Sequence, residues 1–336
     1  MIIITGATGF VGRRLTIQLA RTYGANQLVC LVYNRFDNEL ERTGRAVLDK
    51  LGVNQIEVDL VSGEGLNSIP KSPEMIFHLA ADTDTSIRDH DAINQTATRN
   101  LIEASLPLSP GCRIQFTSSI AVGDHRADGV HFPCREDTKL LRPYHRYGRA
   151  KLATEMYLTD VAAANGAQLT IIRLCAIYGR DTRNPGLFAN VRNLVDRNAW
   201  IARLDYPGKM SFTYVEDIAS ALVLVSQHPP ERGKCEIFTP VGEVLRLAQL
   251  LEKYSFAMRK PYLKIDPGEL LWNLCRAAAK AVLHTEQLWH YKLYNKIWQL
   301  SLTVENSFWN ESDKWRNRFP DFRFHCLEDC FDEMIK

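Results

Sequence analysis

Tyr147 and Lys151 are a residue pair that could do acid/base chemistry on an alcohol or a carbonyl group. They stand four residues apart in an expected helix, Tyr144 to Asn165, so the phenol and the ammonium share one face, a turn apart. A free phenol has a pKa of about 10, and a neighbouring ammonium lowers that pKa toward neutral pH, where proton transfer is most efficient. The pair therefore predicts Tyr147 as a general acid/base. An ordinary surface helix is the alternative for this segment taken by itself.

Two hydroxyls precede this helix by roughly thirty residues. Ser118 and Ser119 follow Ile114 to Thr117, where apolar and polar residues alternate as in a strand. Ligands bind at the carboxyl ends of the strands in parallel sheets. A hydroxyl there can hydrogen-bond a substrate oxygen and hold it beside the phenol, although a Ser-Ser pair alone also suits a plain strand end.

A glycine-rich stretch, Thr5-Gly6-Ala7-Thr8-Gly9-Phe10-Val11-Gly12, follows the apolar run Met1 to Ile4 and precedes a helical pattern. Closely spaced glycines let the backbone turn tightly and approach a pyrophosphate, and the next helix offers N–H groups and its positive dipole end. The stretch predicts an anion site at Gly9 to Gly12. Glycine spacing alone also fits an ordinary strand-to-helix turn.

Strands and helices alternate along the first half of the chain, which indicates a parallel sheet. Besides the first apolar run and Ile114 to Thr117, strands are expected at 28–32, 55–58, 75–79 and 169–174, and helices at 13–23, 37–51, 92–104 and 144–165. The strand at 169–174 is nearly all apolar, as is typical of strands buried on both faces. The sequence thus predicts an α/β fold, a Rossmann-type doubly wound parallel sheet.

The pattern changes after Tyr178-Gly179, where residues 180–186 have a loop composition. Residues 212–225 predict a strand that turns into a helix and returns to the nucleotide domain, and several amphipathic helices follow residue 241. We expect a dinucleotide-binding domain of residues 1–179 plus about 212–240. A smaller, mainly helical substrate-binding region at the C-terminal side would comprise about 180–211 plus 241–336.

The composition excludes some classes of partner. With 46% hydrophobic and 24% charged residues, the 336-residue chain is ordinary for a globular protein. Its 41 basic and 39 acidic side chains give a net charge of +2, too balanced for a nucleic-acid footprint, so a small-molecule partner is expected. The eight cysteines are scattered and no leader is expected, which predicts a cytoplasmic protein. No apolar run reaches about 18 residues, so no transmembrane segment is expected. No metal is expected, because His325, Cys326 and Cys330 lack a second ligand cluster and suit a terminal amphipathic helix.

In their order and spacing, the glycine turn, the Ser-Ser strand end and the Tyr-x-x-x-Lys helix resemble the extended short-chain dehydrogenase/reductase family, of the NAD-dependent epimerase/dehydratase type. The resemblance covers nearly the whole chain, through His78-Leu79-Ala80-Ala81, Asn94-Gln95-Thr96-Ala97-Thr98, Arg173-Leu174, Tyr178-Gly179, Tyr214-Val215-Glu216-Asp217 and Thr303 to Phe319. It implies an NAD(P)-dependent enzyme in which Tyr147 is the acid/base and Lys151 lowers its pKa and binds the nicotinamide ribose. The helix that carries this pair often forms a dimer interface in the family, which implies a homodimer.

The resemblance also implies that Ser119 orients the substrate oxygen and that Asn94 helps to relay protons. Many relatives insert a tyrosine before the glycine of the segment that reads Ala121-Val122-Gly123 here. This departure leaves Ser118 as the alternative catalytic serine.

Further residues are implied in cofactor binding. They are Gly6, Thr8, Gly9, Phe10, Val11 and Gly12 at the pyrophosphate, Asp59 and Leu60 at the adenine, Leu79, Ala80 and Ala81 along the ribose-phosphate, and Tyr147 and Lys151 themselves. The second strand ends Val32-Tyr33-Asn34-Arg35, where an acid would bind the ribose 2′-OH of NAD and an arginine would accommodate the 2′-phosphate of NADP. Because no acid stands there and Arg35 is close, the sequence favours NADP, with NAD as the alternative.

Substrate class is indicated by two features. Nucleotide-sugar members of the family commonly carry an arginine that pairs with the substrate diphosphate, and Met210 stands at that position here, beside Lys209. The tail from Glu269 to Leu302 is rich in Leu, Trp and Tyr with interspersed Lys and Arg. This composition suits an apolar substrate pocket or a helix at a membrane interface. Between membrane contact and plain packing of a helix in the smaller domain, the sequence favours packing. We expect hydride transfer to or from a small alcohol or ketone, hydrophobic ones included. The alternatives are a nucleotide-sugar epimerase/dehydratase with internally recycled NAD and a non-catalytic dinucleotide-binding sensor.

Overall fold

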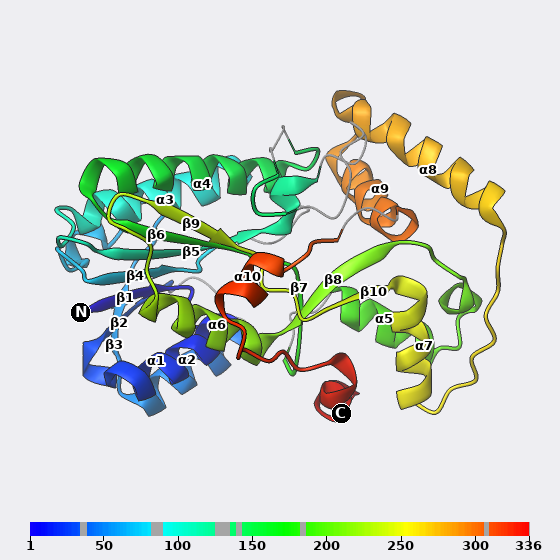
Figure 1. Cartoon of the computed structure of the whole chain (residues 1–336), viewed down its shortest axis with the longest axis horizontal. Coiled ribbons are helices and arrows are strands. Elements are labelled where there is room, and N and C mark those ends of the chain that lie inside the picture. Colours follow the sequence, from blue (N-terminus) through cyan, green and yellow to red (C-terminus); the bar gives the residue numbers. More distant parts are fainter. Residues whose placement is uncertain are drawn as a thin grey trace. The chain divides into compact units, whose positions relative to one another are not determined.

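A computed structural model describes residues 1–33, 39–81, 90–124, 135–138, 143–181, 186–305 and 309–335. The chain forms two compact units, each built from separate stretches (Figure 1). Unit 1 comprises Met1–Val122, Arg146–Leu174 and Val215–Pro240, and unit 2 comprises Gly123–His145, Cys175–Tyr214 and Val241–Lys336.

Seven parallel strands form the sheet of unit 1, in the order β3-β2-β1-β4-β5-β6-β9. Their bounds are β1 Ile2–Thr5, β2 Leu28–Val32, β3 Asn54–Glu57, β4 Met75–His78, β5 Arg113–Ser119, β6 Gln168–Leu174 and β9 Cys235–Phe238. The strand order runs outward from β1 in one direction and from β4 in the other, and ligands of doubly wound sheets bind at this switch point. The expected α/β fold with a Rossmann-type parallel sheet is confirmed.

Burial of the central strands explains their apolar sequences. Every residue of β1 and of β2 is buried, as is typical of strands covered by helices on both faces. The edge strand β3 has exposed ends and carries polar residues instead. The loops that follow β1 and β4 therefore start from a rigid, fully packed base.

In the described part of unit 1, five long helices cover the sheet. They are α1 Gly12–Tyr23, α2 Glu39–Leu51, α3 His90–Ser105, α4 Arg146–Asn165 and α6 Val215–Gln227. Helix α1 packs against α2 and α6 on one face, and α3 packs against α4 on the other (Figure 1). An ion pair between Arg14 Nε and Glu216 Oε1, 2.8 Å apart, fastens α6 to α1.

Unit 2 combines a small sheet with helices. Strand β8 (Lys209–Tyr214) runs antiparallel to β10 (Glu243–Arg246) and parallel to β7 (Ala176–Tyr178). The helices are α5 Leu187–Asp196, α7 Leu247–Ala257, α8 Glu269–His284, α9 Tyr291–Val304, α10 Asp313–Arg318 and α11 Phe331–Ile335. Tyr178, Phe212 and Tyr254 are almost fully buried in its core. Within the described parts of the chain, no helix has the length and apolar character to cross a membrane.

The boundary between the units differs from the expected domain boundary chiefly in one region, and by a few residues at 175–179 and 212–214. Residues Gly123–His145 belong to unit 2, although the sequence places them in the segment 1–179. Contacts with α9 explain the difference: Trp298 Nε1 donates to Asp124 Oδ2 at 2.6 Å, and the His145 ring stacks on Trp298 with centroids 4.3 Å apart. These contacts span more than 150 positions of the chain, which no local pattern reveals.

Candidate active site

The turn between β1 and α1 brings the backbone against the end of β4. Gly6 has a φ of +68°, in the left-handed region, and a Cβ there would lie 2.8 Å from Ala80 N. A Cβ on Gly12, the first residue of α1, would fall on the carbonyl oxygen of Gly6. The Gly9 N–H donates to that same oxygen at 3.0 Å. Backbone packing therefore requires glycine at positions 6 and 12.

The start of α1 has the character of an anion site. Among the described residues no side chain caps this helix, and its first turn holds no acidic residue. The N–H groups of a first helical turn lack intrahelical partners and form the positive end of the helix dipole. The residues present therefore fit the pyrophosphate of a dinucleotide.

Thr5 fixes the loop after β4 beside this turn. Its Oγ1 accepts the N–H of Leu79 at 3.2 Å and of Ala80 at 3.0 Å, and it lies 2.8 Å from His78 Nδ1. The other ring nitrogen of His78 is hydrogen-bonded to Thr98 Oγ1 at 2.9 Å. Burial lowers the pKa of His78 to about 3, and the charge of Lys151 acts in the same direction. His78 is thus a neutral packing residue that holds Leu79 and Ala80 against the glycine turn.

Lys151 joins the start of α4 to the end of β5. Its side chain is buried, and Nζ donates to the backbone oxygen of Thr117 at 2.8 Å. Nζ also lies 4.7 Å from the ring centroid of Phe116 and 6.0 Å from that of Tyr147. The predicted phenol–ammonium pair and the predicted strand end are therefore brought together at one atom.

A buried ion pair lies one helical turn beyond Lys151. Arg173 of β6 donates to both carboxylate oxygens of Glu155, from Nε at 3.1 Å and from Nη2 at 2.8 Å. Burial lowers the pKa of Lys151 from 10.5 to about 7, while the Glu155 carboxylate raises it. Sequence reasoning missed Glu155, although its four-residue spacing from Lys151 on the helix was an available signal.

The two serines at the end of β5 differ in accessibility. Successive side chains of a strand point to opposite faces. Ser118 is 2% exposed, whereas Ser119 is partly exposed and its Oγ accepts the Ala121 N–H at 3.2 Å. This difference favours Ser119 as the serine that a substrate could reach. Asn94 is buried on α3, and its backbone oxygen accepts the Thr98 hydroxyl at 2.8 Å, next to the His78 network.

The other predicted cofactor residues have structural partners of their own. The Thr8 hydroxyl donates to Glu41 Oε2 at 2.8 Å. The guanidinium carbon Cζ of Arg14 lies over the Phe10 ring, 4.8 Å from the ring centroid. The Asp59 carboxylate accepts the N–H groups of Val61 and Ser62 and so holds its own turn. Leu60 is buried in the core of unit 1. Val11 precedes α1 as its N-terminal capping position, Ala81 is the last described residue after β4, and Arg35 lies outside the described residues.

Other residues that the sequence singles out concern substrate binding and metal binding. Met210 is buried in the core of unit 2. Its thioether side chain is uncharged and packed there, so it cannot pair with a diphosphate. Lys209 Nζ lies 5.4 Å from the ring centroid of Trp309. Of the residues that the structure describes, no three His, Cys, Asp or Glu are grouped to hold a metal ion. Cys330 packs in the same core as Met210, and the Cys326 thiol donates to Asp329 Oδ2 at 2.9 Å.

The family model described as "NAD dependent epimerase/dehydratase family" matches residues 2–239, well over half of the chain. The chain belongs to this family, as its motifs predict. The enzymes among its relatives include epimerases, dehydratases and reductases.

Two curated relatives illustrate the range of this family. UDP-glucose 4-epimerase of Vibrio cholerae is 24% identical over 319 residues, which cover 90% of this chain and 84% of that protein. Cinnamoyl-CoA reductase 1 of Oryza sativa subsp. japonica is 25% identical over 268 residues, which cover 75% of this chain and 74% of that protein. The chain spans only 5% of the length of one further curated relative and 57% of another.

Among solved structures, a variant of UDP-glucuronic acid 4-epimerase from Bacillus cereus, in complex with UDP-4-deoxy-4-fluoro-glucuronic acid and NAD, is similar to this chain. The TM-score is 0.74 at 17% identity, and the match covers 99% of this chain and 98% of that one. At this identity the likeness shows a shared fold.

Proposed function

We propose that this chain is an NAD-dependent enzyme that exchanges a hydride between the dinucleotide and a substrate carbon that bears a hydroxyl or keto oxygen. The supporting observation is the position of Lys151 Nζ, bonded to the Thr117 oxygen and 6.0 Å from the Tyr147 ring centroid. A positive charge there stabilises the Tyr147 phenolate, so the phenol can exchange a proton near neutral pH.

The other residues bind and orient. The glycine turn and the start of α1 would hold the pyrophosphate, Lys151 the nicotinamide ribose, and the Ser119 hydroxyl the substrate oxygen. The bound nicotinamide supplies the hydride chemistry. Tyr147 accepts the hydroxyl proton when an alcohol is oxidised and returns it when a ketone is reduced.

For the cofactor we propose NAD. The preference for NADP rests on the absence of an acid at the end of the second strand and on Arg35, which lies outside the described residues. The matched family is NAD-dependent, and similar solved structures contain NAD. Binding titrations with both reduced dinucleotides test this choice, and tighter binding of NADPH would contradict it.

For the substrate we propose a small alcohol or ketone, hydrophobic ones included. The burial of Met210 supports it, because an arginine able to pair with a diphosphate is replaced there by a packed thioether. A nucleotide-sugar epimerase or dehydratase that recycles its NAD is the second candidate, favoured by the epimerases among the relatives and similar structures.

One experiment separates the two candidates. Purified protein with NAD or NADH is offered panels of nucleotide sugars and of hydrophobic alcohols and ketones, while nicotinamide absorbance and product composition are followed. Net change of absorbance with a ketone supports the first candidate, and conversion of a nucleotide sugar without net change supports the second. Tyr147→Phe should abolish either turnover and leave dinucleotide binding intact, so an unchanged rate would refute the role of Tyr147.

A further inference from the structure

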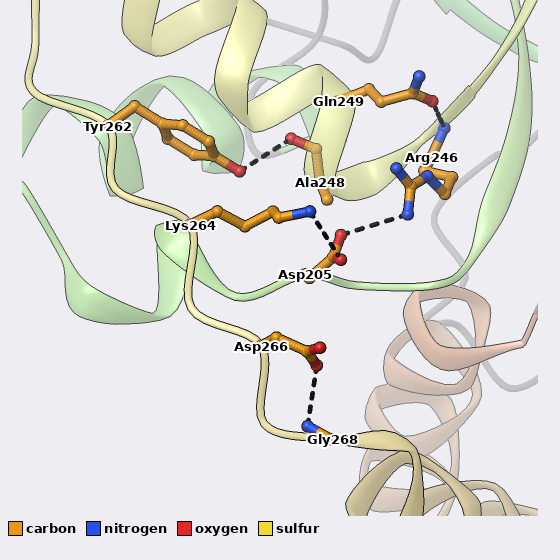
Figure 2. Close-up of polar contacts among 8 residues, drawn as sticks. All are labelled: Asp205, Arg246, Ala248, Gln249, Tyr262, Lys264, Asp266 and Gly268. Carbon is orange, nitrogen blue, oxygen red and sulfur yellow. Dashed lines mark hydrogen bonds and ion pairs between the residues drawn. The ribbon is translucent and has the colours of Figure 1, made fainter.

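The extended segment between α7 and α8 is tied to unit 2 through its polar side chains. The Tyr262 hydroxyl donates to the backbone oxygen of Ala248 at 3.4 Å, and Lys264 Nζ lies 3.2 Å from Asp205 Oδ2. Figure 2 shows Tyr262 and Lys264 pointing toward the same side of the segment, and Arg246 reaching the other oxygen of Asp205 at 3.3 Å. Tyr262 and Lys264 therefore point toward the protein.

The apolar residues of the segment face solvent. Successive side chains of an extended chain point to opposite sides, so Leu263 and Ile265 point away from Tyr262 and Lys264. Leu263 is 73% exposed and Ile265 is 39% exposed. The backbone is held in this register, because Ile265 N donates to Arg203 O at 2.8 Å and Ile265 O accepts from Asp205 N at 2.9 Å. The usual arrangement, apolar inside and polar outside, is inverted here.

Helix α8 continues the exposed apolar surface. Trp272, Ala279 and Leu283 are its buried residues. Its other face exposes Leu270 by 76% and Leu274 by 60%, and these two residues are one helical turn apart. The same face continues through the exposed Ala277, Ala278 and Ala281. Helix α8 is therefore apolar on its buried face and on the face opposite to it.

Exposed apolar side chains follow α8 as well. Leu288 is 76% exposed, Trp289 38% and Leu293 45%, in the turn before α9 and in its first turns. We name residues 259–296 the apolar-basic stretch. It also carries seven of the chain's 41 basic residues but three of its 39 acidic ones, so the rest of the chain has 34 basic and 36 acidic residues. Lys280, Lys292 and Lys296 are exposed, whereas Lys264 is paired with Asp205.

These two properties decide between occupants. A second copy of the chain, meeting the same stretch across a two-fold axis, would bring like charges together. An anionic lipid surface accepts apolar side chains at its acyl boundary and attracts lysines with its headgroups. We propose that the apolar-basic stretch of unit 2 binds the surface of an anionic lipid bilayer, with Leu263, Leu270 and Leu274 entering the boundary layer. This inference does not depend on the proposed enzymatic function.

Vesicle flotation of the full chain tests the proposal. We expect the protein to float with phosphatidylcholine vesicles that contain phosphatidylglycerol, and to bind at least about tenfold more weakly to phosphatidylcholine alone or in high salt. Leu270→Ser with Leu274→Ser should weaken binding at least about tenfold, because both side chains are exposed and lose only their lipid contact. Lys280→Glu with Lys292→Glu should weaken binding to the anionic vesicles by about tenfold or more.

Matched substitutions elsewhere give the control. Val61 and Met156 of unit 1 are 43% and 64% exposed, and Val61→Ser with Met156→Ser should leave vesicle binding unchanged. Thermal unfolding of each variant verifies that it is folded. Wild-type protein that stays unbound with anionic vesicles overturns the proposal. So does a leucine variant that dissociates an oligomer in sedimentation velocity while its vesicle binding is unchanged, because the stretch would then be an interface between copies.

Discussion

Lys151 combines deep burial with a positive charge, and we expect its removal to stabilise the protein while abolishing turnover. Burial lowers the pKa of Lys151 to about 7, against 10.5 for an ordinary lysine. Between these values the unfolded chain binds more protons than the native one, so the contribution of Lys151 to stability rises as the pH increases through this window. Lys151→Met should raise the free energy of unfolding by about 1–4 kcal/mol at neutral pH. The gain should vanish near pH ~10.

Urea denaturation at both pH values measures this difference. Exposed Lys50 on α2 provides the control, since Lys50→Met removes a lysine that stays solvated in both states. A gain for Lys151→Met that is equal at the two pH values would show that packing, and not charge, is responsible. Retained turnover would show that Tyr147 acts without the ammonium.

At the scale of single residues, the sequence predicts which side chains could do chemistry, but not the residues that hold those side chains in place. The Tyr147–Lys151 spacing on a helix is local, so the sequence predicts the pair, and the structure places the lysine beside the phenol ring. The contact of Lys151 with Thr117, and the ion pair of Glu155 with Arg173, join residues of different elements. No local spacing links a helix residue to a particular strand carbonyl, so these partners emerge only from the fold.

At the scale of the elements, the β1–α1 turn requires glycine at position 12, because backbone atoms occupy the space that a Cβ would fill. A Cβ on Gly12 would fall on the Gly6 carbonyl oxygen, which cannot move without displacing β1. We expect Gly12→Ala to destabilise the protein by about 1–3 kcal/mol and to weaken dinucleotide binding at least about tenfold. Fluorescence titration with NADH and thermal unfolding measure the two effects.

Gly9→Ala is the matched control in the same turn. A Cβ there would lie 3.2 Å from the same Gly6 oxygen, a contact that a shift of a few tenths of an ångström can relieve. Its effect should therefore be clearly smaller than that of Gly12→Ala. Equal effects would mean that flexibility of the turn, and not the close approach at Gly12, sets the requirement.

The ion pair between Glu155 and Arg173 fastens α4 to β6 in the interior of unit 1. Arg173→Met leaves the Glu155 carboxylate buried without its bidentate partner, and should lower the free energy of unfolding by about 3–5 kcal/mol. Glu155→Leu combined with Arg173→Met removes both charges and should recover most of that loss. A double-mutant cycle in urea measures the coupling. A double variant as unstable as Arg173→Met would contradict the role of charge.

For the whole molecule, the order of the elements was predictable where strands and helices alternate. It was unpredictable where the chain passes from one unit to the other. Alternating strands and helices predict a parallel sheet, and the observed order β3-β2-β1-β4-β5-β6-β9 is that of a doubly wound fold. The chain passes between the two units five times. Of the segment Gly123–His145, Asp124 and Tyr144 are bonded to Trp298 and Tyr294 of α9, so their place in unit 2 depends on residues far along the chain.

Dinucleotide binding should stabilise one part of this molecule selectively. All the predicted dinucleotide-binding residues that the structure describes lie in unit 1, so a ligand that binds only the folded state stabilises the unfolding transition of that unit. At about 100 times its dissociation constant, NAD should add about 2.7 kcal/mol to the free energy of unfolding. Calorimetry with NAD or with NADP at equal concentrations measures the shift, and Gly12→Ala should reduce it. A larger shift with NADP would assign the adenine ribose site to a 2′-phosphate, and no shift with either dinucleotide would remove the basis for hydride transfer.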